Sequence, residues 1–308
     1  MSQDMRWQKR GLIFVPDGKL WWARAGAQLP TASVIDDRVI RVYFGSKDQD
    51  GFGRTGRIDL DGNDPRQIIE VASKPVLDLG ELGAFDDCGA VPNSVISYAG
   101  RQYLYYQGFQ RTERVPYLTF TGLAISDDSG KSFKKYARTP ITDRTDAEPF
   151  IRSTPCVRVE GNQFKMWYVS TVRWVQNEHG VHYVCVIRYA TSSDGIHWET
   201  HPHVCLEPRL PDEYAVGRPS IMHDGLRYRM WYSMRSFSKL YMLGYAESSD
   251  GIVWERKDDE VGIGPSSSGW DSEMVCYPSV VEIDGQKLML YNGNGRGLSG
   301  IGYAVLEE

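Results

Sequence analysis

One short pattern occurs five times along the chain, and this recurrence constrains the fold more than any other feature of the sequence. Each copy begins at a proline, continues as a short apolar strand, turns, and returns as a second strand of alternating pattern. Arg218–Ser233, with its turn at His223–Gly225, is the clearest copy. The copies begin at Pro30, Pro92, Pro155, Pro219 and Pro278. Because these positions lie roughly 60 residues apart, the sequence predicts stacked or radial β units.

Each repeat continues beyond the hairpin with a second motif. Ile187–Trp198 has the pattern of a third strand, a turn at Ser193–Gly195 and the start of a fourth strand. Leu243–Trp254 repeats this motif closely, and Gly122–Phe133 carries it with one inserted residue. A repeat of four antiparallel strands is the blade of a β-propeller. We therefore expect an all-β fold, a five-bladed β-propeller with four antiparallel strands in each blade.

The two ends of the chain are complementary. The last repeat stops after its third strand, Gly300–Leu306, whereas Met5–Arg10 near the N-terminus resembles Ile252–Lys257 of the preceding repeat. We expect residues near 5–15 to complete the last blade and close the ring, which also hides two sheet edges. Since each blade needs its neighbours to bury its faces, we expect residues 1–308 to form a single domain.

Composition narrows the class of function. A net charge of −5 argues against general nucleic-acid binding, and no apolar run approaches the roughly 18 residues of a membrane span. The N-terminus lacks the apolar core of a signal peptide, and the five cysteines are scattered without metal-ligand spacing. We expect a cytoplasmic protein that uses no metal or other cofactor and has no nucleic-acid or membrane partner.

The predicted loops differ in length between the two faces. Turns within the hairpins are short, whereas the connections between second and third strands and between repeats are long. Long loops on one face of a rigid scaffold usually carry the binding chemistry. These long connections are 46–56, 78–91, 108–117, 142–154, 170–183, 208–218 and 264–277.

Carboxylates precede the first strand of four repeats, in the pairs Asp86 and Asp87, Asp146 and Glu148, Asp212 and Glu213, and Asp271 and Glu273. Because the starts of these strands should face a common axis, we expect some of the acids to converge. Converging carboxylates shift one another's pKa and can divide acid from base work. We predict Asp87, Glu213 and Glu273 as catalytic residues. The alternative is that these acids cap turns or pair with arginines.

Arginines and aromatic residues occupy the same loops. A guanidinium group matches the geometry of a carboxylate or phosphate, and an aromatic ring can stack on a sugar. We expect Arg152, Arg218 and Arg235 to hold an anionic group and Trp174 to form a sugar platform. The alternative is an internal lattice of salt bridges. The full set of predicted substrate-binding residues is Arg24, Arg152, Trp174, Arg218, Arg235, Asp271 and Asn294.

The repeats, with carboxylates at the starts of their first strands, resemble the five-bladed propeller glycosidases of glycoside hydrolase families 32, 43, 62 and 68, and the family 130 mannoside phosphorylases. The recurring Ser-Ser-Asp-Gly-Ile-x-Trp and Arg-x-Met-Trp-Tyr phrases and Gly269–Pro278 look like a bacterial branch associated with surface-polysaccharide genes. Ser126–Phe133 is similar to the Asp-box turn of sialidases, which is structural.

The resemblance implies an enzyme acting on a small carbohydrate or sugar phosphate. Family 43 enzymes carry a Glu two residues before a proline, but Ser153 stands two residues before Pro155, and Gln28–Pro30 offers no acid in the first repeat. The family 43 triad is therefore not present. Three functions stay open: a glycosidase for a glycan bearing an anionic group, a phosphorylase or nucleotide-sugar enzyme, and a glycan-binding propeller without catalysis.

Overall fold

The computed structural model of the chain describes residues 5–178 and 180–307. Strands form nearly all of its regular structure, which confirms the predicted all-β class. The helical segments in the described residues are one 3₁₀ turn, η1 (Asp258–Glu260), and one short helix, α1 (Asn294–Gly297). No helix in this part of the chain is long and apolar enough to cross a bilayer.

Antiparallel pairing groups the strands into four-stranded units, which we number 1 to 5. Unit 1 contains β2 (Ala25–Asp36), β3 (Val39–Lys47), β4 (Gly53–Asp61) and β5 (Ile68–Val71). Unit 2 contains β6 (Gly89–Tyr98), β7 (Arg101–Arg111), β8 (Tyr117–Ser126) and β9 (Lys134–Lys135). Unit 3 contains β10 (Arg152–Glu160), β11 (Gln163–Asn177), β12 (Gly180–Ser192) and β13 (Glu199–Leu206). Unit 4 contains β14 (Glu213–His223), β15 (Tyr228–Ser236), β16 (Met242–Ser248) and β17 (Glu255–Arg256). Unit 5 contains β18 (Cys276–Ile283), β19 (Gln286–Asn292), β20 (Ile301–Glu307) and β1 (Arg6–Phe14).

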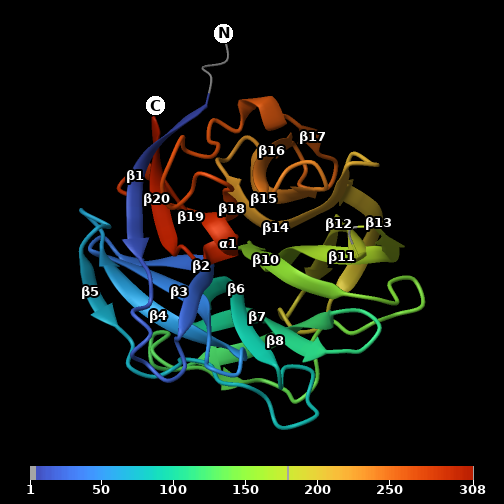
Figure 1. Cartoon of the computed structure of the whole chain (residues 1–308), viewed down its shortest axis with the longest axis horizontal. Coiled ribbons are helices and arrows are strands. Elements are labelled where there is room, and N and C mark those ends of the chain that lie inside the picture. Colours follow the sequence, from blue (N-terminus) through green and yellow to red (C-terminus); the bar gives the residue numbers. More distant parts are fainter. Residues whose placement is uncertain (1–4, 179, 308) are drawn as a thin grey trace.

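The units are arranged around a centre, where the first strands β2, β6, β10, β14 and β18 lie (Figure 1). Serine hydroxyls on these strands accept hydrogen bonds from backbone N–H groups in the first strand of the following unit. The bonds run from Val157 N to Ser94 Oγ (2.9 Å), from Val280 N to Ser220 Oγ (2.9 Å) and from Ala32 N to Ser279 Oγ (3.0 Å). The last of these bonds joins unit 5 to unit 1.

The N-terminal strand lies at the outer edge of the C-terminal unit. β1 pairs antiparallel with β20, from Arg6 opposite Glu307 to Phe14 opposite Ile301. Trp7 on this strand is buried and meets the Trp231 ring edge-on at 5.7 Å between centroids. β1 thus occupies the position expected for residues near 5–15, and its main apolar anchor reaches into unit 4.

Neighbouring units are also joined through the turns that begin Ser126-x-Asp128, Ser192-x-Asp194 and Ser248-x-Asp250, which we call the Ser-x-Asp turns. An aromatic side chain on the second strand of one unit donates a hydrogen bond to a glycine carbonyl in the turn of the next. The pairs are Tyr43 with Gly130 (2.9 Å), Tyr105 with Gly195 (3.0 Å) and Trp167 with Gly251 (2.6 Å). All three glycines have a positive φ near 75–79°, the left-handed region that glycine adopts without steric cost.

Four first strands share one backbone irregularity directly before the repeated proline. Leu29, Thr154, Arg218 and Tyr277 have φ between 49° and 57°, and the strand pairing shifts register at each position. A positive φ in a residue other than glycine is uncommon and costs on the order of 1–3 kcal/mol. A bulge re-aims a side chain, so this irregularity directs four side chains away from the regular alternation of the strand.

Candidate functional site: a cationic central cavity

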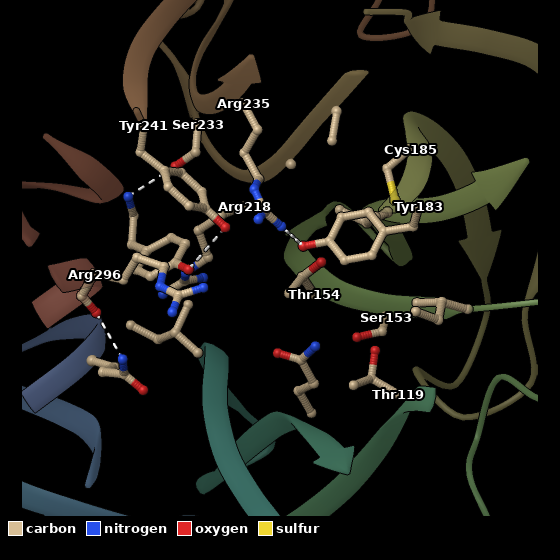
Figure 2. A pocket seen from close by; sticks show the side chains of 18 of the residues that line it. Thr119, Ser153, Thr154, Tyr183, Cys185, Arg218, Ser233, Arg235, Tyr241 and Arg296 are labelled. Carbon is tan, nitrogen blue, oxygen red and sulfur yellow. Dashed lines mark hydrogen bonds between the residues drawn. The ribbon is translucent and has the colours of Figure 1, made fainter. Parts of the chain in front are cut away.

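A cavity of about 310 Å³ opens at the centre of the molecule, where residues from all five units meet. Its volume falls in the range of about 300–1,000 Å³ that is usual for small-ligand sites. The four residues with positive φ before the repeated prolines all line it: Leu29, Thr154, Arg218 and Tyr277. The shared bulge therefore places side chains in this cavity. Figure 2 shows how several of the polar side chains face one another across it.

The lining is cationic. Lys47, Arg218, Arg235 and Arg296 are among the lining residues, and no Asp or Glu of the described chain is. The cavity differs in this respect from the expected pocket of carboxylates and arginines. None of these four positive charges has an opposite charge on the cavity wall. Lys47 and Arg296 are exposed, whereas Arg235 is half-buried and Arg218 is buried, and a buried charge without a counter-charge favours an anionic ligand.

Arg218 forms the floor of the cavity and is 4% exposed. Its guanidinium donates to the carbonyl oxygens of Asn93 and Pro30 and to Thr31 Oγ1, the latter two at 2.7 and 2.9 Å. These partners lie on β2 and β6, so one side chain joins three first strands. Burial lowers the pKa of Arg218 to about 10, which still leaves the group charged at neutral pH.

Arg235, near the end of β15, lies among tyrosine rings. Its guanidinium carbon is 5.0 Å from the Tyr183 ring centroid, 5.2 Å from Tyr214 and 4.9 Å from Tyr241. A guanidinium group is attracted to the electron-rich face of such a ring. Burial lowers the pKa of Arg235, but the tyrosine oxygens around it outweigh this effect and raise the pKa above its usual value. Arg235 is therefore a permanent cation.

The tyrosine hydroxyls form two linked pairs on the cavity wall. The Tyr183 oxygen accepts a hydrogen bond from Arg235 and another, of 3.4 Å, from Tyr117. The Tyr277 hydroxyl donates to the Tyr241 oxygen at 3.2 Å. Burial raises the pKa of Tyr117, Tyr241 and Tyr277, so these three stay protonated. Tyr117 and Tyr277 donate to their tyrosine partners, which leaves the Tyr241 proton for a ligand.

The three acids predicted to be catalytic lie away from the lining of this cavity. Glu213 forms a double hydrogen bond with Arg256, at 2.9 and 3.0 Å. Asp87 is half-buried and accepts the Gly83 N–H at 2.9 Å. Glu273 is exposed. The structure does not bring these carboxylates together, and their predicted catalytic roles gain no geometric support.

A repeated arrangement inside the units holds three of the other loop acids, Asp86, Glu148 and Asp271, and also Asp258. Each buried carboxylate accepts a bond from the tyrosine at one repeated position of the second strand and contacts a cation. The sets are Asp86 with Tyr106 and Lys135, Glu148 with Tyr168 and Arg152, Asp258 with Tyr232 and Arg256, and Asp271 with Tyr291 and Lys9. A buried carboxylate is tolerated when it is paired and hydrogen-bonded. These acids therefore point toward their own unit and not toward the axis.

The predicted substrate-binding residues divide into two groups. Arg218 and Arg235 line the cavity, and Trp174 packs edge-on against Tyr183, a lining residue, at 5.6 Å. The remaining four lie elsewhere. Arg152 and Asp271 belong to the carboxylate–tyrosine sets, Arg24 is exposed and donates to Gly18 O, and Asn294 donates to Gly269 O.

Other lining residues were harder to find from the sequence. No sequence pattern singles out Lys47, Tyr183 or Tyr241. A signal did exist for Thr154 and Tyr277, because both stand directly before a repeated proline, as Arg218 does. Among the described residues, no group of three His, Cys, Asp or Glu side chains is placed to hold a metal ion.

Comparison with known proteins places the chain in a family. No protein-family model matches it. Two proteins of Mycobacterium tuberculosis do: Rv1502 of strain H37Rv and MT1551 of strain CDC 1551 are each 36% identical over 304 residues, which is 99% of this chain and 100% of theirs. The chain belongs to the family of these two mycobacterial proteins. Both relatives are described as uncharacterised, so the family relationship carries no activity with it.

Solved structures extend the comparison at the level of the fold. A glycosyl hydrolase from Bacteroides ovatus superposes with a TM-score of 0.76 at 13% identity, covering 98% of this chain and 94% of that one. A structure from the GH130 family of mannoside phosphorylases and glycoside hydrolases gives 0.75 at 13% identity, covering 99% and 94%. The chain described here therefore has the propeller fold of glycoside hydrolases.

Proposed function

We propose that the chain is a carbohydrate-active enzyme whose central cavity takes a sugar unit bearing a carboxylate or phosphate group. The observation that supports this proposal is the lining: Lys47, Arg218, Arg235 and Arg296 surround a cavity on whose wall no described carboxylate lies. The guanidinium fork binds carboxylate and phosphate oxygens in pairs. The glycoside hydrolase-like fold supports the carbohydrate part of the proposal by analogy.

We further infer that the five units are the blades of one closed five-bladed propeller, and that they form a single domain. The bond from Ala32 N to Ser279 Oγ between units 5 and 1 supports closure. The pairing of β1 with β20 supports it as well, because it joins both ends of the chain in one sheet. In such a ring every blade contributes to the central cavity.

The aromatic residues suit the rest of the sugar. Tyr183 and Tyr241 present ring surface beside Arg235, and stacking on such rings is a common way of binding a sugar face. Because Tyr241 stays protonated and only accepts the bond from Tyr277, its own hydroxyl can donate to a ring oxygen or hydroxyl of the sugar. The anionic group would lie against the guanidinium groups and the sugar ring against the tyrosines.

For the chemical step we propose Tyr183 as the reacting group. Glycoside hydrolysis usually depends on a pair of catalytic carboxylates, and none lies on the cavity wall among the described residues. Tyrosine can act as a general acid or as a nucleophile. The Tyr183 oxygen accepts bonds from Arg235 and Tyr117, and both donors would stabilise the phenolate left when the proton passes to a departing glycosidic oxygen. Water or phosphate would then attack the anomeric carbon, and in the reaction with water the proton that the water loses would return to the Tyr183 phenolate.

Turnover of acidic oligosaccharides, with and without inorganic phosphate, tests this proposal. We expect the chain to release reducing sugar from an acidic substrate and not from its neutral analogue. Tyr183→Phe should lower kcat by about 10²–10⁴-fold, the usual contribution of a general acid, with little change in KM. Tyr214→Phe is the matched control, since Tyr214 packs on Arg235 but does not line the cavity. Full activity of Tyr183→Phe would remove Tyr183 from the mechanism.

The same lining favours one other function. A cationic cavity without carboxylates on its wall also suits a propeller that binds an acidic glycan without changing it. The two functions separate on one measurement. The chain is a binding protein if it binds an acidic glycan, if the Arg235→Gln variant does not bind that glycan, and if the glycan is recovered unchanged after long incubation with the wild-type chain. Phosphate-dependent release would instead identify a phosphorylase.

A further inference from the structure

A second cavity adjoins the first and carries an inference about the length of the ligand. It measures about 390 Å³ and lies between units 1 and 2. Five residues line both cavities: Gln28, Leu29, Lys47, Phe109 and Tyr117. The cationic central cavity therefore has a lateral extension along one side.

The wall of the second cavity combines rings and cations. Phe109 and Tyr117 meet edge-to-face at 5.7 Å between centroids, and Lys47 is exposed beside them. The Arg111 guanidinium lies 4.6 Å from the Phe52 ring and donates to the carbonyl oxygens of Asp50 and Gly51, both at 3.2 Å. This wall has the same chemistry as the central cavity, aromatic surface with positive charge.

No described Asp or Glu lines this second cavity, and the nearby acids have partners of their own. Asp48 is bound to Arg54, and Arg54 also holds Asp78 at 2.6 Å. Asp87, next to the lining residue Cys88, accepts the Gly83 N–H. Along the axis of the molecule, by contrast, Arg218 closes the central cavity with bonds to Asn93, Pro30 and Thr31. A ligand that outgrows the central cavity is therefore directed toward units 1 and 2.

We propose that the second cavity binds the next sugar of an acidic oligosaccharide, so that the ligand has at least two units. This inference rests on the proposed function. The anionic sugar occupies the central cavity, its neighbour packs on Phe109 and Tyr117, and Lys47 lies at the junction. Tyr117 lines both cavities and donates to Tyr183, so the bond between the two sugars passes close to the proposed reacting hydroxyl.

Calorimetric binding of mono-, di- and trigalacturonic acid tests the proposal, because these probes differ only in the number of acidic units. We expect digalacturonic acid to bind the wild-type chain at least tenfold more tightly than the monomer. The third unit should add less than the second, since the two cavities accommodate two sugars.

Two variants address the second cavity alone. Arg111→Gln removes its outer cation, and Cys88→Leu narrows it; neither residue lines the central cavity. Both should bring the affinity for the dimer to within about twofold of that for the monomer, while the affinity for the monomer is unchanged. Arg114→Gln is the matched control, an exposed arginine in the same connection that lines neither cavity, and should keep the full gain.

The outcomes separate the two proposals. Monomer binding without a gain for the dimer would overturn the second subsite and leave the central anion site intact. A gain that survives both Arg111→Gln and Cys88→Leu would also overturn it. If none of the three uronic acids binds and inorganic phosphate does not raise the melting temperature, the proposed function fails, and the subsite inference fails with it.

Discussion

At the scale of single residues, the chain separates its charges into two environments. Carboxylates lie within the units, where Glu213 meets Arg256 and Asp271 meets Lys9. The cations at the centre, such as Arg235, are surrounded by rings and hydroxyls. A carboxylate next to Arg235 would compete with an anionic ligand for the guanidinium group. Its absence from the cavity wall is what keeps the site available.

Glu213 gives the first prediction. Its side chain is 13% exposed, and its removal leaves the buried Arg256 with fewer compensating contacts. We expect Glu213→Ala to lower the free energy of unfolding by about 3 kcal/mol, the lower end for breaking a buried ion pair, because Asp258 remains. Urea unfolding measures this change. Glu273→Ala, at an exposed position, should stay within about 0.5 kcal/mol of wild type. A stable Glu213→Ala variant without turnover would return Glu213 to a catalytic role.

Arg235 gives the opposite prediction. Arg235→Gln removes a charged donor from the cavity but leaves the tyrosine cluster in place. A hydrogen bond to a charged group contributes about 1.5–3 kcal/mol, so the affinity for an acidic sugar should fall about 10–100-fold. The stabilisation of the fold by ligand measures this loss, since the melting temperature rises with ligand concentration over Kd. An unchanged dissociation constant would exclude Arg235 from the site.

The residue scale also shows where sequence reasoning stops. Arg218 and Arg235 could be identified because arginines in long loops on one face favour an anion site. The catalytic acids could not, because the same spacing before a first strand fits a carboxylate aimed at the axis and one aimed at its own unit. The deciding partner is a tyrosine on the second strand, such as Tyr106 or Tyr168. That tyrosine recurs in the sequence and could have served as the signal.

At the scale of elements, the Ser-x-Asp turns join neighbouring units. Gly195 has φ near 75°, and a Cβ atom there would lie 2.7 Å from the Tyr105 hydroxyl and 2.8 Å from the Phe164 ring. The turn therefore requires glycine both for its backbone and for the approach of the neighbouring unit. Sequence similarity to the Asp-box located these turns, but their contact with the preceding unit depends on how the units are packed.

Gly195→Ala tests this contact. A left-handed conformation costs a residue with a side chain about 1–2 kcal/mol, and overpacking adds about 1–3 kcal/mol. We expect a loss of about 2–5 kcal/mol in the free energy of unfolding. Gly161→Ala is the matched control, with φ of 59° and no atom within 4 Å of the added Cβ, and should lose only the backbone part. Equal losses in the two variants would show that the contact between units contributes nothing.

The aspartates of the same turns predict a dependence on pH. Partial burial disfavours the charged form, but hydrogen bonds outweigh it and lower the pKa of Asp128, Asp194 and Asp250. The donors are hydroxyl and backbone groups and, for Asp194, the His197 side chain. The unfolded chain, with carboxyl pKa values near 3.9, then binds more protons than the folded one. The stabilisation that these three carboxylates contribute is fully present above about pH 4 and is lost as the pH falls through their lowered pKa values.

Urea midpoints at pH 7, 5 and 3 measure this loss. We expect a small change between pH 7 and 5 and a clear decrease between pH 5 and 3. The Asp128→Asn variant should have a lower urea midpoint than the wild type at pH 7. Its midpoint should also fall less than that of the wild type between pH 5 and 3, because one of the contributing carboxylates is gone. A wild-type midpoint that does not change down to pH 3 would contradict the assigned shifts.

At the scale of the whole molecule, the first and last strands share one sheet. The repeated hairpins predicted the strands and their pairing well, because strand alternation and tight turns are local properties. The likeness of Met5–Arg10 to a fourth strand placed β1 beside β20. The central cavity was less predictable. Its lining comes from bulges in the first strands and from the extended β11–β12 hairpin, and neither follows from the alternation of apolar residues.

Trp7 tests how much the shared sheet contributes to stability. The indole is 4% exposed and packs against Trp231 in unit 4. Replacing a buried large aromatic residue by alanine costs about 3–5 kcal/mol, so we expect Trp7→Ala to lower the melting temperature of the whole molecule in one transition. Trp21→Ala, at a side chain 52% exposed, should cost less than about 1 kcal/mol. Separate melting of unit 5 would show that the ring is not cooperative.

The residues that precede the repeated prolines have one more consequence. Leu29, Thr154, Arg218 and Tyr277 share a backbone conformation but differ in side chain: aliphatic, hydroxyl, cationic and phenolic. This backbone conformation therefore accepts different residue types, and the strain lies in the main chain whichever side chain is present. Arg218 is bonded to two other first strands, but relatives of this protein can diversify their ligands by exchanging the other three side chains while the scaffold is kept. The same three positions are the natural targets for redesigning what the molecule recognises.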